Sequence, residues 1–464
     1  MFWLKGWPCD GRATLALLFP IVRGARLACD SCTSGALFGS SILGAVMARA
    51  MRRPAAASGI VKKTICKKRP AAAFNPFTAP KRGDGRVQGR RGPENGDVSY
   101  VRTDEGATKT RKERQRWCRT IDSFTTDTDA ELVDLLIEDG ILFDWSGLTC
   151  PFCGKGTLGD RYIKQWASGS GYEWRCNDGR KCGKQVRPTH CHPIFAEGNG
   201  KETSTLKDKA RVLFGILTGM TTAQIYLHYV KNHKMIEDMT RNLDLARKQY
   251  VEKYEKDIVY GDGKKWVDVE ADESVFATAL TEDKRAKEWG QWAGVAQRGK
   301  PATLVLFKTE SDRTAKNAPG PGAIKKSDWK PFLLGRLKDR KVVLHSGGAR
   351  SYKMKAPGLL HDAAIHCKKR VKRGGKWVWI KPVYSKIVKH KLPSGNVLKV
   401  KSGTQIIDRA WKHVKNHIGP RAYKPHSRGL AARVRSAQWE YWHRGKDPWA
   451  ATGAMVRDLM GSTF

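Results

Sequence analysis

The sequence predicts an α/β protein with a mixed β-sheet, preceded by a four-cysteine hairpin and a helical segment. Three observations lead to this fold class. Four cysteines fall in two pairs between Cys150 and Cys182. Apolar residues then recur at steps of three and four over 205–255, which is the period of an amphipathic helix. From 265 onward, short apolar runs separated by Gly- and Pro-containing loops are typical of strands, and a helix over 404–418 follows them.

The chain is strongly basic. Its 464 residues include 86 Lys and Arg against 45 Asp and Glu, a formal net charge of +41. This excess goes beyond what solubility needs and predicts a polyanionic partner, which we take to be double-stranded DNA; basic tails or a solvated basic surface are the alternative. We predict no membrane span, because no run of about 20 apolar residues occurs. The 11 Cys are too few for a disulfide scaffold and favour a metal site.

Residues 1–115 are predicted to be a disordered basic N-terminal region. Basic low-complexity segments such as Arg52-Arg53-Pro54 and Lys67-Lys68-Arg69-Pro70 cannot bury enough apolar surface to fold. Clusters of this kind serve as nuclear import signals or electrostatic DNA arms, so we expect a nuclear protein. A disordered tail that no partner reads is the alternative.

The region 116–200 contains two cysteine pairs that predict a zinc ribbon. A hairpin-sized insert of 22 residues separates the pairs. Four thiolates satisfy tetrahedral Zn²⁺ and leave no open position, so we expect the zinc to be structural; buried free thiols are the alternative. Cys191 and His192 lie nearby and are less well spaced candidates for one ligand. The predicted ligands are Cys150, Cys153, Cys176 and Cys182.

Helical signals lie on both sides of this ribbon. A short helix is predicted over 128–139, where a capping box precedes a leucine-rich face. Residues 201–260 are predicted to form a segment similar to a helix-turn-helix, because Gly219 separates one helix from a second that a capping box at Thr221 opens. A helical hairpin that only packs is the alternative, and the ribbon and positive charge favour DNA contact. A basic helical tail is predicted over 421–464.

Short apolar runs mark the strands of region 261–420. The first strand ends at Asp272, where a carboxylate is costly to bury unless a cation neutralises it, and oxygen ligands favour Mg²⁺ or Mn²⁺; a solvated strand-end acid is the alternative. The helix over 404–418 carries Asp408, about 60° around the helix from Trp411. Strands followed by an acid-bearing helix predict a mixed sheet of the ribonuclease H type. Further strands are predicted at 291–295, 303–307, 341–344, 377–380 and 384–388.

Taken in order, these pieces resemble a known family. They are the ribbon, the helical segment, a strand ending in Asp272-Glu-Ser, a later Ala-Arg-Ser-Tyr352, and a helix with an acid three residues before Trp411. Over about residues 120–445 this order resembles the ISXO-type insertion-sequence transposases and their eukaryotic Merlin relatives. The resemblance implies a DDE transposase whose ribonuclease H-like domain holds two divalent ions, Mg²⁺ or Mn²⁺, with three acids.

The resemblance also assigns the three acids residue by residue. The first catalytic acid is Asp272, and the third is Asp408, where many relatives carry Glu. The second acid is absent, because Gly347 occupies its place five residues before the tyrosine, and glycine offers no ligand. The nearest spare carboxylates, Asp339 and Asp362, are not in register with that position.

The sequence therefore predicts a transposase-derived DNA-binding protein. It would bind element ends and catalyse metal-dependent strand cleavage and transfer, impaired by the loss of the second acid at Gly347. The alternative from another class is a domesticated DNA-binding protein without catalysis. A decayed element copy with no present role is a third reading, and an RNA-processing nuclease is the least favoured. A homodimer on DNA is compatible with all the DNA-binding readings.

Overall fold

The computed structural model places most of the chain from residue 98 onward. The described residues are 98–102, 117–125, 128–166, 169–179, 181–195, 204–229, 233–310, 313–365, 369–380, 382–420 and 423–461. The predictions of disorder, import signals and DNA arms for residues 1–97 and 103–116 lie outside them. The α/β class with a mixed sheet is confirmed.

The first described elements form a helix and a small sheet. Helix α1 (Asp129–Glu138) begins as predicted, because the Thr128 side chain accepts a hydrogen bond from the N–H of Glu131. Trp174 of β2 is fully buried and donates from its indole to the Ser146 hydroxyl at 2.9 Å. The antiparallel sheet consists of β1 (Tyr162–Trp166), β2 (Gly169–Arg175) and β3 (Gln185–Val186).

The helical segment contains the predicted turn at Gly219 and the predicted helix start at Thr221. Gly219 adopts φ +83°, a left-handed conformation that suits glycine, and ends the first helix. Thr221 and Gln224 form the predicted capping box of the second helix. The helices are α2 (Leu206–Leu217), α3 (Thr222–His228) and α4 (His233–Tyr254), and a single turn, η5 (Glu255–Asp257), follows them.

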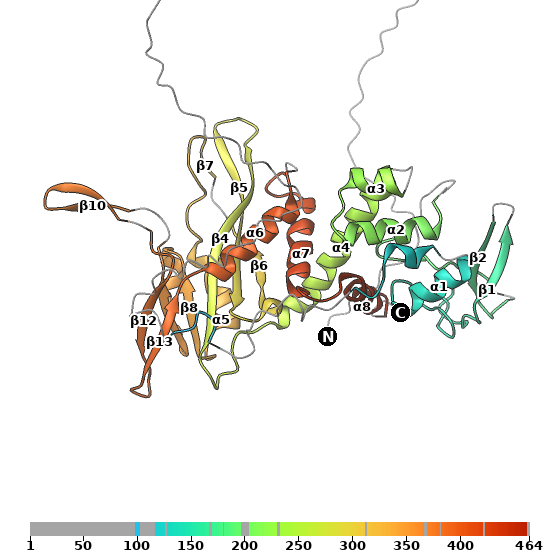
Figure 1. Ribbon diagram of the computed structural model, residues 1–464, viewed down its shortest axis with the longest axis horizontal. Coiled ribbons are helices and arrows are strands. Elements are labelled where there is room, and N and C mark those ends of the chain that lie inside the picture. Colours follow the sequence, from blue (N-terminus) through green and yellow to red (C-terminus); the bar gives the residue numbers. More distant parts are fainter. Residues whose placement is uncertain are drawn as a thin grey trace, which may run out of the picture. The chain divides into compact units, whose positions relative to one another are not determined.

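A mixed six-stranded sheet occupies the middle of the chain (Figure 1). Its order is β6-β5-β4-β8-β9, with β7 paired to β5. Strands β4, β5 and β6 are antiparallel neighbours, whereas β8 and β9 run parallel to β4. The strands are β4 (Val267–Leu280), β5 (Ala286–Gln297), β6 (Val305–Lys308), β7 (Thr314–Ala315), β8 (Val342–Ser346) and β9 (Leu359–Ala363). The connecting helices are η6 (Pro301–Thr303), α5 (Lys326–Arg336) and η7 (Arg350–Lys353).

Two hairpins and three helices complete the chain. The predicted tail over 421–464 contains two helices that pack into the core, where Trp439 and Trp449 are buried. The first of them, α7 (Arg428–Trp442), contacts α4 and α6 (Gln405–Ile418). The hairpins are β10 (Lys369–Arg373) with β11 (Lys376–Ile380), and β12 (Lys386–Lys391) with β13 (Val397–Ser402). The helices are α6 (Gln405–Ile418), α7 (Arg428–Trp442) and α8 (Pro448–Gly461).

The two faces of β4 have opposite character. Val267, Val269 and Ala271 point into an apolar core that includes Trp329 of α5. Their neighbours Asp268, Glu270 and Asp272 occupy the other face, because side chains alternate along a strand. Helix α6 packs on this acidic face, in contact with both β4 and β5 (Figure 1).

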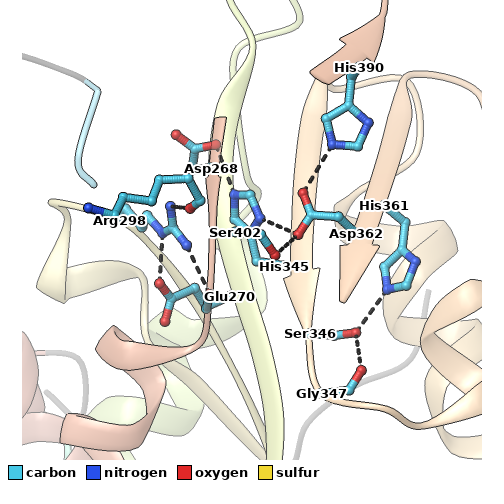
Figure 2. Close-up of polar contacts among 12 residues, drawn as sticks. Asp268, Glu270, Arg298, His345, Ser346, Gly347, His361, Asp362, His390 and Ser402 are labelled. Atoms are coloured by element: carbon cyan, nitrogen blue, oxygen red, sulfur yellow. Dashed lines mark hydrogen bonds and ion pairs between the residues drawn. The ribbon is translucent and has the colours of Figure 1, made fainter. Parts of the chain in front are cut away.

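Glu270 fixes the start of α6 on this face. Its carboxylate is fully buried and accepts hydrogen bonds from the backbone N–H groups of Ile406 and Ile407, at 2.7 and 3.0 Å. These are two of the N–H groups that the first turn of a helix leaves without an internal partner. Arg298 neutralises the carboxylate at 2.7 Å (Figure 2). It also donates to the carbonyls of Lys401 and Gly403. One buried acid therefore links β4, the end of β5 at Arg298, and α6.

A short N-terminal segment, 98–102, lies against the same face. The Tyr100 hydroxyl donates to Glu270 at 2.6 Å and accepts from the N–H of Gln405 at 2.9 Å. Arg102 forms an ion pair with Asp268 at 2.5 Å. The region that the sequence predicts to be disordered thus includes side chains held against the sheet.

Replacing Glu270 with alanine should destabilise the fold strongly. The change leaves Arg298 buried without its partner and removes the cap of α6, so we expect the free energy of unfolding to fall by about 3–5 kcal/mol. Urea denaturation followed by circular dichroism measures this loss. The exposed Glu282→Ala variant is the control and should change stability by less than about 0.5 kcal/mol. Equal stability of the two variants would contradict the role of Glu270 in holding α6 on the sheet.

Candidate functional site

The four predicted cysteines converge. Their sulfur atoms lie within 4.8 Å of one another, with Cys150 and Cys182 at 3.8 Å and Cys153 and Cys176 at 3.8 Å. A tetrahedron of thiolates about 2.3 Å from Zn²⁺ has edges of about 3.8 Å, so the spacing fits the metal. Within the described residues, this is the one group of three or more His, Cys, Asp or Glu side chains that close together. The cluster could bind a metal ion such as zinc.

Local backbone geometry prepares these sulfur atoms for a cation. Gly154, at φ +65°, turns the chain so that the N–H groups of Gly156 and Lys155 face Cys153 and lower its pKa to about 6. Burial and the neighbouring thiols raise the pKa of Cys176 to about 12. Four thiolates in one place therefore need a positive ion to balance their charge.

Cys191 and His192, the weaker ligand candidates, lie outside the cluster. His192 is buried and hydrogen-bonded through Nε2 to the carbonyl of Ile141 at 2.7 Å, while its Nδ1 accepts from the N–H groups of Ile194 and Phe195. Burial lowers the pKa of His192 to about 4. This histidine therefore serves the local chain fold.

Asp272 does not stand at the end of its strand, as the sequence suggested. It lies inside β4, which continues to Leu280 in antiparallel pairing with β5. The parallel pairing with β8, however, stops at Ala271 and Ser346. Asp272 is thus the first residue of β4 beyond the end of β8, where the sheet opens on that side.

Asp272 and Asp408 line one cleft of about 410 Å³. Asp408 projects from the first turn of α6 and is exposed, and Trp411 follows it on the same helix. Gly294 pairs with Asp272 across β4 and β5, and a Cβ there would lie 2.5 Å from the Trp411 ring. The missing side chain on β5 therefore lets α6 settle beside Asp272. The cleft is lined by Asp272, Glu273, Ser274, Asp408, Trp411, Lys412, Lys415 and Asn416.

Gly347 borders the same acid. It follows β8 directly, and the next step of the parallel register would place it beside Asp272. A Cβ built on Gly347 would lie 3.4 Å from Oδ1 of Asp272, an ordinary contact distance. A carboxylate at this position would therefore reach Asp272, and glycine leaves that side of the cleft without one.

The surroundings of Asp272 oppose its ionisation. Burial, the charge of adjacent Glu273 and the charge of Asp408 raise its pKa to about 7, against the opposing N–H of Glu273 and the Trp411 indole. Glu273 itself faces the other side of the sheet, where it accepts from the N–H of Ile324 at 3.1 Å. A divalent cation in the cleft would relieve the repulsion between Asp272 and Asp408.

A row of buried polar groups runs from Asp268 of β4 across β8 and β9 (Figure 2). His345 lies between Asp268, at 3.0 Å, and Asp362, at 2.8 Å. Burial lowers the pKa of His345, but the hydrogen bonds to these two carboxylates outweigh that effect and raise it. Asp362 also contacts His390 at 3.0 Å and accepts from the Ser402 hydroxyl, which ties the β12–β13 hairpin to the sheet.

Neither spare carboxylate replaces the missing acid. Asp362 is committed to His345, His390 and Ser402, and these hydrogen bonds outweigh its burial and hold its pKa well below the ordinary value. Asp339 adopts φ +61° in the turn before β8 and is exposed. The cleft therefore brings together the two predicted acids, Asp272 of β4 and Asp408 of α6, with no carboxylate at position 347.

A larger hollow of about 1510 Å³ involves α3, α4 and α7, and neither predicted acid lines it. Four of its charged side chains form two ion pairs: Arg247 pairs with Glu440 at 2.7 Å, and Arg433 pairs with Asp244 at 2.9 Å. These ion pairs join α4 to α7. We assign this hollow no chemistry.

Comparisons of the chain with models of protein families, with curated proteins and with solved structures find no match. None of the helices in the described part of the chain combines the length and apolar character that a bilayer crossing requires.

We expect the purified chain to hold one zinc ion per molecule, because four sulfur atoms stand at tetrahedral spacing. Elemental analysis measures this ratio. The Cys153→Ser variant should lose most of the metal, whereas Cys191→Ser, which alters the exposed cysteine nearby, should keep it. Metal loss in the second variant would instead make Cys191 a ligand.

The raised pKa of Asp272 predicts that stability changes with pH. The unfolded carboxyl ionises near 3.8 and the folded one near 7, so the folded state holds more protons between these values and loses stability as pH rises through them. Without added divalent cations, the native chain should lose about 2–3 kcal/mol of stability relative to Asp272→Asn when the pH rises from 5 to 8. Urea denaturation at both pH values measures this loss.

The exposed Asp160→Asn variant is the control and should keep the same small difference from the native chain at both pH values. Adding Mn²⁺ at pH 8 should stabilise the native chain and leave Asp272→Asn unchanged. A difference between Asp272→Asn and the native chain that does not vary with pH would contradict the burial argument.

Proposed function

We propose that the chain is a DNA-binding protein of the DDE-transposase type with impaired strand cleavage. The observation that carries the proposal is that Asp272 and Asp408 line one cleft, although they lie 136 positions apart in the sequence. In this function Asp272 and Asp408 would hold divalent ions, which would supply Lewis-acid chemistry for cleavage of a phosphodiester bond.

The sheet topology supports a ribonuclease H-type domain. Three antiparallel strands, β6-β5-β4, are extended by the parallel strands β8 and β9, and α6 covers the acidic face. The positions assigned to the three acids then fall on β4, directly after β8, and on α6. Because β4 neighbours β8 and contacts α6, the three positions come together.

The vacant position at 347 supports impairment. The acids of the cleft do not form a group of three or more ligand atoms as close together as the cysteine cluster does. Losing one of three preorganised acids should cost roughly 3–4 kcal/mol of transition-state stabilisation, or about two to three decades in rate. The two remaining acids could still attract one cation.

The charge of the chain supports a DNA partner. The net charge of +41 favours a polyanion, and Lys412 and Lys415 line the acid cleft, where a phosphate backbone would meet them. Helix α3 of the helix-turn-helix-like segment contains no Lys or Arg. The phosphate contacts of this proposal therefore come mainly from other elements. The four cysteines would hold a structural zinc in a ribbon, and the basic N-terminal region favours a nuclear location.

A non-catalytic DNA-binding protein is the second candidate, and Gly347 is the observation that favours it. A gel-shift comparison of terminal-inverted-repeat DNA with random DNA tests this function. Specific binding together with no cleavage in Mn²⁺ would support it. Equal binding to both DNAs would support only a general affinity for polyanions.

Restoring the acid tests the catalytic proposal. We expect Gly347→Asp to cleave a duplex carrying the terminal inverted repeats about 100-fold to 1000-fold faster than the native chain in Mn²⁺. The reason is that a side chain at 347 reaches Asp272. Denaturing electrophoresis of an end-labelled duplex measures the rate.

The matched control is Gly348→Asp. A Cβ at 348 meets nothing within 4 Å, so the same charge placed one residue later points into open space and should leave the rate unchanged. Adding Asp272→Asn to Gly347→Asp should abolish the gain. Robust cutting by the native chain, equal to that of Gly347→Asp, would refute the impairment.

A further inference from the structure

The β10–β11 hairpin exposes large apolar side chains next to charged ones. Its two strands pair only with each other among the described strands. Gly374 and Gly375 join them with φ of +56° and +80°, the two positive values that a tight hairpin turn needs. Trp377 is 58 % exposed and Trp379 is 62 % exposed. Two large indoles in water on an isolated ribbon indicate a surface that a partner covers.

The two indoles lie among basic side chains on one face. The antiparallel register pairs Arg370 with Trp379 and Lys372 with Trp377, so all four side chains share that face. The Arg370 guanidinium lies 5.3 Å from the Trp377 ring centre and 5.9 Å from that of Trp379. The face thus offers flat aromatic surfaces and positive charge together.

The charge of the surrounding chain selects a polyanion. Between Asp362 and Asp408 the sequence holds 12 Lys and Arg and no Asp or Glu. The opposite face of the hairpin also carries exposed Arg373 and Lys376. Cations on both faces leave no separate apolar face, which insertion into a lipid surface would require. Carboxylates of an acidic protein would match the charge but would leave the indoles uncovered.

We propose that the β10–β11 hairpin binds unpaired DNA, with bases stacked on Trp377 and Trp379 and phosphates held by the basic side chains around them. Base–aromatic stacking is favourable for every base and needs bases whose faces are accessible, which a closed duplex does not offer. Side chains two residues apart on a strand begin about 6.8 Å apart. This is about twice the 3.4 Å step of stacked bases, so one base fits between the rings.

This inference rests on the proposed function in taking DNA as the polyanion, and it deepens that function. Strand cleavage leaves ends whose bases can unpair. The hairpin lies in the sequence between β9 and α6, the element that carries Asp408. A hairpin in this insert that binds single strands would hold such an unpaired DNA end. This binding does not require that the cleft of the same chain can cut DNA.

The test uses the full chain and fluorescence anisotropy with a labelled 20-nucleotide oligothymidylate and a labelled 20-base-pair duplex. The double variant Trp377→Ala/Trp379→Ala should bind the single strand at least about tenfold more weakly and the duplex within about twofold of the native chain. The conservative variant Trp377→Phe/Trp379→Phe should retain most single-strand affinity. Ile163→Ala, which removes a 56 % exposed side chain from β1, should change neither affinity.

A charge variant separates stacking from phosphate contact. Lys372→Gln/Arg373→Gln should lower the salt dependence of single-strand binding by about 1.4 in the slope of log affinity against log salt. The double alanine variant should leave that slope unchanged. The inference would be overturned if the double alanine variant kept its affinity for single-stranded DNA and instead lost binding to anionic phospholipid vesicles or to polyglutamate.

The remaining outcomes distinguish this inference from the proposed function. A native chain that binds neither DNA overturns both. A native chain that binds DNA while the double alanine variant binds both forms unchanged, or loses both equally, overturns the hairpin inference and leaves the DNA-binding proposal standing. Circular dichroism of each variant checks that the fold is intact.

Discussion

The buried carboxylate of Glu270 holds together segments that are far apart in the sequence. An isolated charge in the interior would be prohibitive, and Arg298, the Tyr100 hydroxyl and two N–H groups of α6 satisfy it together. Because these partners come from the residue directly after β5, from the N-terminal segment and from α6, the position of the helix on the sheet is fixed. Because Asp408 lies in the first turn of α6, fixing the start of this helix also fixes the position of Asp408 beside β4.

Local features of the fold could be predicted from the sequence. The helix starts at Thr128 and Thr221 depend on hydrogen bonds between each threonine and the residue three positions later. The four cysteines of the cluster could likewise be identified from their spacing in the sequence. The strand end at Asp272 could not be predicted, because it depends on which neighbour stops first. β8 ends beside Ala271, while β5 continues to pair far beyond it.

The candidate site shows the same division. Both predicted acids reach one cleft, yet the row through Asp268, His345 and Asp362 was missed, since it exists only when β4, β8 and β9 are adjacent. Asp362 looked like a spare acid in the sequence because its partners lie 17, 28 and 40 residues away. The alternation of Asp268 with Val267 and Val269 was the one available signal of a polar sheet face.

Gly294 places an unusual demand on the chain. Gly294 is not one of the described glycines with positive φ, so the backbone freedom of glycine is not the reason why this position needs one. The reason is steric: the indole of Trp411 occupies the volume in which a methyl group would stand. The effect of mutations at Gly294 therefore depends on how closely α6 packs on β5, which lies more than a hundred residues earlier in the sequence, and not on local backbone flexibility.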